Sequence, residues 1–171
     1  MARALIVFYS RTGVTRRVAQ SLAKKLDADL LPIEDVRPRE GMLGYLRSVL
    51  EAENATLPDI VPVAFAPEEY DLVVFGTPVW AGHVSSPMRR FLHDHAASQA
   101  PRIAFFCTFG GSGTEGAFRD MRELAGREPE ATCALRDRDV FAGNPQFTID
   151  AFATRLGRNQ GVPTVASQPS A

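Results

Sequence analysis

Three stretches of the sequence are apolar without interruption, and each leads into a segment rich in glycine or hydroxyl side chains. They are Ala4–Tyr9, Leu72–Phe75 and Ile103–Cys107. Continuous apolar runs, in contrast to alternating ones, are typical of strands that are covered on both faces, as in parallel sheets. Two weaker runs, near Asp29–Ile33 and Thr132–Leu135, predict further strands. We therefore expect a largely parallel sheet.

Between these strands, apolar residues recur at helical spacing. Val18, Leu22 and Leu26 fall on one face of a helix predicted over Val14–Leu26. Strands and helices that alternate without internal repeats predict an open, doubly wound α/β sheet with helices on both faces and right-handed crossovers. Another helix is expected over Met42–Glu53. Ser86-Pro87 would begin the next one with a capping serine and a proline at its first position, and Ser112 with Glu115 would begin a further one with a capping box. A last helix would carry Ile149, Phe152 and Leu156.

Length and composition are those of one globular domain. The chain has 171 residues, of which 45% are hydrophobic and 23% charged, so it can bury a core that offsets the entropy of ordering. We expect a single domain over residues 1–157 and a flexible tail over residues 158–171, where apolar periodicity is absent. No stretch is suited to a transmembrane helix or a secretory signal. Cys107 and Cys133 form no CxxC pair and no disulfide framework, which favours a cytoplasmic location.

The charge is nearly balanced overall but uneven along the chain. Nineteen Lys and Arg against 20 Asp and Glu give a formal charge of −1, which argues against binding to nucleic acid or to an acidic membrane surface. We expect the cations that precede Asp27 to surround an anion site at the start of the Val14–Leu26 helix. They are Arg3, Arg11, Arg16, Arg17, Lys24 and Lys25.

Each of the three strong strands ends in an unusual loop. These loops are Ser10–Thr15, Gly76–His83 and Thr108–Gly113. In a parallel sheet, ligands bind beyond the carboxyl ends of the strands, where the strand order reverses. If the three strands are neighbours, the three loops surround one pocket.

The Ser10–Thr15 loop has the chemistry of a phosphate site. The N-terminus of a helix offers unpaired N–H groups and a partial positive charge, and Gly13 lets the backbone approach an anion closely. The three hydroxyl side chains of the loop add donors. Arg16 and Arg17 stand in the first helical turn, where the helix dipole disfavours cations unless an anion is bound. The alternative is that the threonines only cap the helix.

The other two loops suit a flat heterocycle. Trp80 offers an apolar wall beside backbone donors and acceptors, although a lone tryptophan also suits a core. Phe109 would cover the second face of the ring. The third loop continues into Gly111–Gly116, which matches G-x-G-x-x-G between a strand and a helix. A dinucleotide is disfavoured there, because this fingerprint normally occupies the first strand–helix turn of such a fold.

The histidines are weaker candidates. His83 could donate a proton to a substrate near the pocket, and the alternative is a solvent-facing loop position. His93 and His95 lie two apart on a predicted helix and point to different faces, so no metal site is expected. The catalytic residues therefore stay unassigned, with His83 as the one candidate.

Taken together, the three loops resemble those of flavodoxin-like flavoproteins. The resemblance extends from about Arg3 to Leu156 and includes the segment Gly41–Leu46, which is similar to a helix near the flavin edge in one branch of the group. It implies a five-stranded parallel sheet of order 2-1-3-4-5 and one non-covalent FMN, with its phosphate in the first loop and its ring between the other two. The implied cofactor-binding residues are Ser10, Arg11, Thr12, Gly13, Val14, Thr15, Thr77, Pro78, Val79, Trp80, Ala81, Gly82, Thr108, Phe109, Gly110, Gly111, Ser112 and Gly113.

Two functions remain open. Flavodoxins that carry electrons are typically acidic around the flavin, whereas neither ring loop here contains an acid and the net charge is −1. This difference favours an FMN-dependent oxidoreductase that passes electrons from NAD(P)H to a quinone-like acceptor or a flavin, over a carrier between redox proteins. Dehydrogenation of a porphyrin precursor and a regulatory module without flavin are weaker alternatives. The oligomeric state, including a homodimer, is left open.

Overall fold

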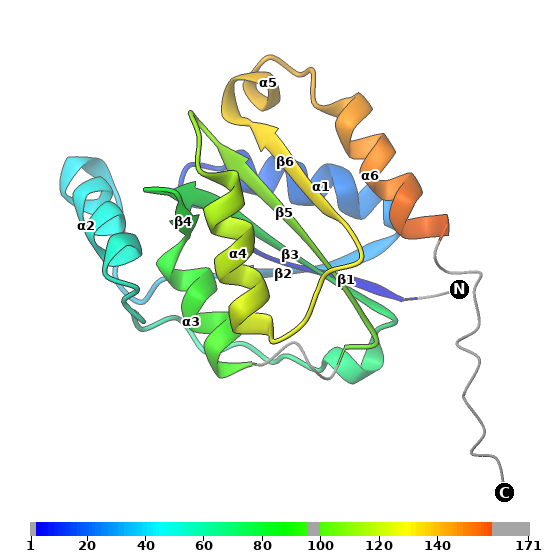
Figure 1. Cartoon of the computed structure of the whole chain (residues 1–171), viewed down its shortest axis with the longest axis horizontal. Coiled ribbons are helices and arrows are strands. Elements are labelled where there is room, and N and C mark those ends of the chain that lie inside the picture. The colour runs from blue at the N-terminus through cyan, green and yellow to red at the C-terminus, as the bar shows by residue number, and fades with distance from the viewer. Residues whose placement is uncertain (1–2, 96–99, 159–171) are drawn as a thin grey trace, which may run out of the picture.

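Five parallel strands form the central sheet of the computed structural model, which describes residues 3–95 and 100–158 (Figure 1). The order across the sheet is β2-β1-β3-β5-β6, and the short β4 pairs antiparallel with the end of β3. Without β4 this is the predicted order 2-1-3-4-5, so the predicted fold is confirmed. The strands are β1 Ala4–Tyr9, β2 Ala28–Ile33, β3 Leu72–Trp80, β4 His83–Val84, β5 Arg102–Phe109 and β6 Thr132–Arg136.

Helices cover both faces of the sheet (Figure 1). On one face lie α1 (Val14–Leu26), α5 (Asp137–Phe141) and α6 (Gln146–Arg158), and on the other lie α3 (Ser86–Asp94) and α4 (Thr114–Ala125). The remaining helix, α2, spans Gly41–Glu53 and stands at one edge of the molecule, in contact with β4 and α3. A single 3-10 turn over Pro67–Glu69 precedes β3.

The strand β1 is buried along its whole length, because its side chains enter two separate cores. Ile6 and Phe8 belong to the core beneath α1 and α6, whereas Leu5 and Val7 belong to the core beneath α3 and α4. This arrangement explains the continuous apolar run, since a strand covered on both faces has no solvent side. The tail predicted over residues 158–171 lies outside the described residues from residue 159 onward. No helix in the described part of the chain is long and apolar enough to cross a membrane.

The strand β3 continues through most of the segment predicted as the second loop, Gly76–His83. It pairs with β1 only as far as Gly76 and with β5 as far as Pro78. The pairing with β1 ends two residues before Pro78, so that ladder does not need the N–H that proline lacks. Ala81 and Gly82 then form a two-residue hairpin into β4, with φ values of 48° and 79°. Positive φ at both positions is the signature of a type I′ turn.

Two predicted helix starts are wrong in detail. Gly113, with φ of 94°, is the N-cap of α4 and has no side chain, so Ser112 and Glu115 do not form the predicted capping box. The N-cap of α3 is Ser85, and no side chain caps that helix either. The hydroxyl of Ser86 donates instead to a carboxylate of α2 at 2.7 Å. A charged acceptor on a neighbouring helix is a stronger partner than a backbone N–H.

Candidate functional site

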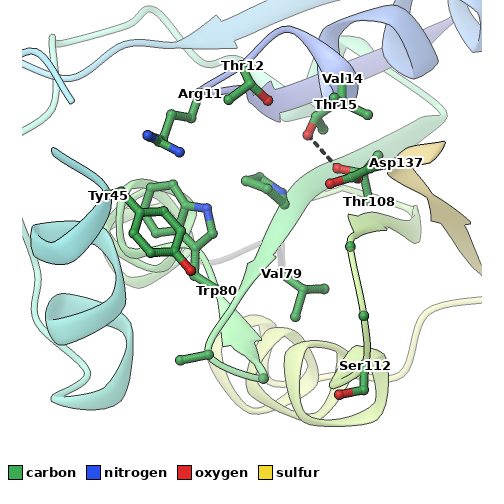
Figure 2. Close-up of a pocket in the computed structure, with 15 residues that line it drawn as sticks. Arg11, Thr12, Val14, Thr15, Tyr45, Val79, Trp80, Thr108, Ser112 and Asp137 are labelled. Carbon is green, nitrogen blue, oxygen red and sulfur yellow. Dashed lines mark hydrogen bonds between the residues drawn. The ribbon is translucent and has the colours of Figure 1, made fainter. Parts of the chain in front are cut away.

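The carboxyl ends of β1, β3 and β5 enclose a cleft of about 560 Å³ (Figure 2). All three predicted loops contribute to it, together with Tyr45 of α2 and Asp137 of α5. Figure 2 shows Arg11, Tyr45 and Trp80 on one side of the cleft and Thr108 with Asp137 on the other. Of the predicted cofactor-binding residues, those that line the cleft are Arg11, Thr12, Val14, Thr15, Pro78, Val79, Trp80, Ala81, Gly82, Thr108, Gly110, Gly111 and Ser112. Their role in binding a cofactor stays a prediction.

The start of α1 presents backbone donors to this cleft. Ser10, which lies behind the wall, accepts from the N–H groups of Gly13 and Arg16, both at 3.1 Å through its Oγ. A helix has unpaired N–H groups throughout its first turn, so those of Val14 and Thr15 remain for a ligand at the cleft. Gly13 has φ of 90° and open space around it, and it serves as the N-cap without a side chain. The Ser10 hydroxyl therefore stabilises the backbone of the loop, and it leaves the N–H groups of Val14 and Thr15 without a partner within the loop.

A buried pair of hydroxyl groups joins the first loop to the third. The Oγ1 atoms of Thr15 and Thr108 lie 2.8 Å apart, and the exposed fraction of each residue is 2% or less. Either hydroxyl can be the donor, so the Thr15 hydroxyl has a hydrogen-bond partner inside the protein, and its role toward a ligand stays a prediction. The pair fixes the distance between the start of α1 and the end of β5, and both of these segments border the cleft.

Three further predicted site residues are not among those that line the cleft. Thr77 is fully buried and accepts from the N–H of Ser85 at 3.1 Å. Phe109 does not line the cleft, and the guanidinium of Arg136 lies 5.5 Å from the centre of its ring. Gly113 lies against the β3–β4 hairpin.

Close packing explains two glycines of the G-x-G-x-x-G match. A Cβ on Gly113 would lie 2.4 Å from the Cα of Gly82, and one on Gly116 would lie 2.2 Å from the carbonyl oxygen of Gly82. The first glycine of the match, Gly111, has open space around it. The two later glycines thus let α4 approach the hairpin that carries Trp80. The motif has a structural reason that requires no dinucleotide.

Trp80 forms the apolar wall of the cleft and is supported from behind. The ring of Tyr9 packs edge-on against it, with centroids 5.5 Å apart. The guanidinium carbon of Arg39 lies 5.3 Å from the centre of the Trp80 ring. On the same side, Tyr45 of α2 lines the cleft beneath the guanidinium of Arg11, at 5.5 Å. Two aromatic rings therefore line the cleft, and each has an arginine over its face.

Arg39 is the centre of a buried ion-pair network that sequence reasoning missed. Its side chain is 1% exposed and lies 2.8 Å from Asp35 and 2.6 Å from Glu51. Asp35 also accepts from the hydroxyl of Tyr9 at 2.6 Å, and Glu51 accepts from Ser86 at 2.7 Å. Burial alone would raise the pKa of the Glu51 carboxyl, but the hydrogen bonds that it accepts from Arg47, Ser86 and Arg39 hold this pKa below its usual range.

This network ties the long segment between β2 and β3 to the back of Trp80. The same segment borders a second cavity of about 400 Å³, which shares Arg11 and Thr12 with the main cleft. One guanidinium nitrogen of Arg39, Nη1, is buried without a hydrogen-bond partner among the described residues. No local pattern in the sequence identifies Arg39, because the partners of its side chain come from three separate parts of the chain.

Asp137 is an acid in the cleft that the sequence analysis did not place there. It follows β6 directly and lines the cleft near Gly110. Its Oδ1 atom is buried and has no hydrogen-bond partner among the described residues. Burial raises the pKa of this carboxyl above its usual value. A signal was available, since Asp137 stands at the carboxyl end of a predicted strand, where ligands bind in parallel sheets.

His83 lies outside the cleft lining, in a polar cluster between β4, α3 and α4. Its Nδ1 lies 2.9 Å from a carboxylate oxygen of Asp120, a buried residue. The same oxygen accepts from Arg89 at 2.7 Å and from the N–H of Val84 at 3.3 Å. The cluster joins the hairpin to both helices, which is a structural role. A catalytic role for His83 stays a prediction.

Three of the six early cations lie far from the phosphate loop, contrary to expectation. Arg3 precedes β1, at the opposite edge of the sheet, and pairs with Asp29 at 3.4 Å. Lys25 stands with Lys24 in the last turn of α1 and pairs with Asp150 at 2.9 Å. A helix of 13 residues is about 20 Å long, so α1 carries its last turn back across the sheet. Only Arg11, Arg16 and Arg17 remain near the start of α1.

The described residues show no group of three or more His, Cys, Asp or Glu side chains placed to hold a metal ion. Both cysteines are free and buried. Burial raises the pKa of the Cys107 thiol, and it raises that of Cys133 to about 12. The cleft therefore offers a ligand backbone donors, hydroxyl groups, aromatic rings, the Arg11 guanidinium and one carboxyl group.

The sheet is doubly wound, a hydroxyl-rich loop follows β1, and an aromatic loop lies at the end of β3. Together these features define a flavodoxin-like α/β protein. The chain belongs to the flavodoxin family, because the family model named Flavodoxin matches residues 3–133. A relative from Archaeoglobus fulgidus, named NAD(P)H dehydrogenase (quinone), is 28% identical over 103 residues. That match covers 54% of this chain and 50% of the relative, so the chain spans about half the length of the curated relative.

Solved structures show the same fold. A flavoprotein from Lactobacillus acidophilus NCFM, determined in complex with FMN, is 24% identical and aligns over 83% of this chain and 98% of its own, with a TM-score of 0.69. A structure from Bacteroides uniformis is 19% identical and aligns over 90% of this chain and 98% of its own, with a TM-score of 0.76. At these identities the similarity establishes the fold, and the chemistry must be argued from the cleft itself.

Proposed function

We propose that this protein binds one FMN in the cleft and passes electrons from NAD(P)H to a small quinone-like acceptor. The observation that carries the proposal is the joint position of an anion-binding helix start and an aromatic wall in one cleft of about 560 Å³. This volume is within the range of about 300–1,000 Å³ that is usual for cofactor and small-molecule sites. The flavodoxin family and the FMN complex of the Lactobacillus flavoprotein support the choice of FMN.

The phosphate end of FMN suits the start of α1. Val14 and Thr15 line the cleft in the first turn of α1, where backbone N–H groups without an intrahelical partner offer charge-assisted hydrogen bonds to a dianion. Thr12 adds a hydroxyl group, and Arg11 adds a positive charge at the cleft. No acidic side chain stands in the first turn of α1, so nothing in that turn repels a phosphate.

The ring end of FMN suits the aromatic side of the cleft. Trp80 offers a flat apolar face that Tyr9 and Arg39 hold in place from behind. Opposite it, Gly110 and Gly111 have no side chains, so the backbone can approach a flat ring closely. The flavin supplies the electron transfer itself when it is bound, while these residues bind it, orient it and exclude water from one face.

Asp137 suits the ribityl chain of FMN, which joins the phosphate to the ring. Asp137 lies beside Thr108, on the side of the cleft opposite Trp80 (Figure 2), and its buried Oδ1 has no hydrogen-bond partner in the described part of the chain. A carboxylate repels a phosphate but accepts hydrogen bonds from hydroxyl groups. The ribityl hydroxyls of FMN would supply the donor that Oδ1 lacks.

The surroundings of the cleft support a small-molecule acceptor over a large basic partner. Asp137 is the one acidic residue among the cleft-lining residues of the described chain, and Arg11 stands opposite it. Such a balanced rim gives little electrostatic steering. The name of the Archaeoglobus relative agrees with this choice, over the part of that protein that the chain matches. The two free and buried thiols suit the cytoplasm, which we retain as the proposed location.

Steady-state oxidation of NADPH and of NADH by the FMN-loaded protein tests the proposal. We expect turnover with a small benzoquinone or naphthoquinone as acceptor. Tyr45→Ala should raise the KM for quinone without weakening FMN binding by a similar factor, since Tyr45 stands at the α2 side of the cleft and is half exposed. Phe147→Ala, at a solvent-exposed position of α6, is the matched control.

A flavodoxin-type carrier is the second candidate, and membership of the flavodoxin family favours it. A carrier would bind FMN with the same residues but would show no turnover with NAD(P)H and quinones. It would accept electrons only from a reductase protein and deliver them to a protein acceptor. Turnover with small molecules alone would therefore reject the carrier, and its absence in FMN-loaded protein would reject the reductase.

A further inference from the structure

The outer face of α2 is apolar, although this helix packs on the protein with its small side chains. Gly44, Ser48 and Ala52 recur every four residues and are buried. A surface helix normally has the reverse arrangement, with its large apolar side chains inward. The exposed side chains of the outer face are Met42 at 79%, Leu43 at 82%, Tyr45 at 54%, Leu46 at 49% and Leu50 at 57%. Figure 1 shows α2 standing at the edge of the molecule, away from the sheet.

Contacts on the inner face fix this orientation. A Cβ on Gly44 would lie 2.3 Å from the carbonyl carbon of Arg39, so only glycine permits this approach. Glu51, on the same helix, lies 2.6 Å from Arg39 and accepts from Ser86 of α3 at 2.7 Å. Rotating α2 to bury its leucines would break a buried ion pair and expose its glycine contact. The exposed leucines are therefore a consequence of the fold itself.

The spacing of the leucines suits another helix. Leu43, Leu46 and Leu50 lie three and four residues apart, which is the spacing by which helices pack side by side through knobs and holes. The charged residue between them, Arg47, is engaged on the flank by Glu51 at 2.7 Å. The exposed Glu53 stands in the last turn of α2, where an antiparallel copy presents the first turn of its own helix, so the two glutamates lie at opposite ends of the interface. An apolar face of this kind can meet a copy of itself, as a two-fold interface requires. We propose that α2 packs against α2 of a second copy of this chain and forms a homodimer.

The size of the face agrees with a dimer. The five exposed side chains present roughly 600 Å² on one copy and roughly 1,200 Å² across a two-fold pair, above the value of about 1,000 Å² expected of a specific interface. Tyr45 belongs both to this face and to the lining of the cleft. The second copy therefore covers the α2 side of each cleft and completes its wall. The dimer does not depend on the identity of the cofactor.

Sedimentation equilibrium over a wide range of protein concentrations tests the dimer, with and without added FMN. The wild type is expected to dimerise, and the double variant Leu43→Glu, Leu50→Glu is expected to raise the dimer dissociation constant at least about 100-fold. Both leucines are more than half exposed, so the far-UV circular dichroism of the variant should match that of the wild type, which shows that the variant is folded. Phe147→Glu is the matched control, because Phe147 is 85% exposed on α6 and should leave the dimer intact.

Oxidative cross-linking identifies the interface directly. Leu46→Cys places one accessible thiol at the centre of the leucine row, while both native cysteines are buried. We expect a disulfide-linked dimer from Leu46→Cys and none from Phe147→Cys. A wild type that remains monomeric at its highest soluble concentration overturns the proposal, as does a double glutamate variant that dimerises normally. A monomer that cosediments with lipid vesicles assigns the face to a membrane surface and overturns the proposal as well.

Discussion

Gly113→Ala tests whether the glycines after β5 serve packing. The new Cβ would lie 2.4 Å from the Cα of Gly82, and the residue holds φ at 94°. A left-handed conformation costs an alanine about 1–2 kcal/mol, and forcing extra volume against fixed backbone costs about 1–3 kcal/mol. The free energy of unfolding should therefore fall by about 2–5 kcal/mol. For a chain of this length the melting temperature should fall by about 5–15 °C.

Gly111→Ala is the matched control, because a Cβ there meets no atom within 4 Å and φ is outside the left-handed region. Its melting temperature should stay close to that of the wild type. Gly116→Ala should lie between the two, since its clash with the Gly82 carbonyl oxygen is offset in part by the higher helix propensity of alanine. Differential scanning calorimetry measures the melting temperatures of the three variants. Equal melting temperatures for Gly113→Ala and Gly111→Ala would refute the packing argument.

Three further predictions concern the buried polar groups. Arg39→Met leaves the carboxylates of Asp35 and Glu51 without their buried cation, so the free energy of unfolding in chemical denaturation should fall by about 3–5 kcal/mol. Arg90→Met, at a surface ion pair, is the control and should leave the denaturation midpoint unchanged. Thr108→Val strands the hydroxyl of Thr15 and should cost about 1–3 kcal/mol, and the double valine variant should recover part of that loss. Because the folded-state pKa of Glu51 is lowered, its contribution is complete above the unfolded pKa of about 4.5 and is lost as pH falls through the folded value. Glu51→Gln should therefore flatten the acid limb of the stability profile.

The sequence predicted the elements whose causes are local. The apolar run of β1 and the helical period of α1 give both elements their observed bounds, Ala4–Tyr9 and Val14–Leu26. The three strand-end loops also predicted the place of the cleft, because strand neighbours in a doubly wound sheet follow from topology. The hairpin at Ala81 was missed, since alanine rarely adopts the positive φ that the turn requires.

Contacts between residues that are far apart in the sequence could not be predicted from local sequence patterns. Arg39 is buried only because Asp35, Glu51 and Trp80 surround it, and these come from three different parts of the chain. Asp137 enters the cleft because β6 lies beside β5, so an acid 24 residues after Gly113 reaches the same cleft. The orientation of α2 likewise depends on the ion pair of Glu51, which outweighs the burial of three leucines.

Quenching of the Trp80 fluorescence tests the central claim most directly. Trp80 is the single tryptophan of the chain and lines the cleft, so a flavin bound against it should quench its emission with a stoichiometry of one. FMN and riboflavin differ only in the phosphate, and two charge-assisted hydrogen bonds from the start of α1 should favour FMN by about 3–6 kcal/mol, or at least 100-fold in Kd. Equal affinities for the two flavins, or emission that neither flavin changes, would contradict the placement of FMN in this cleft.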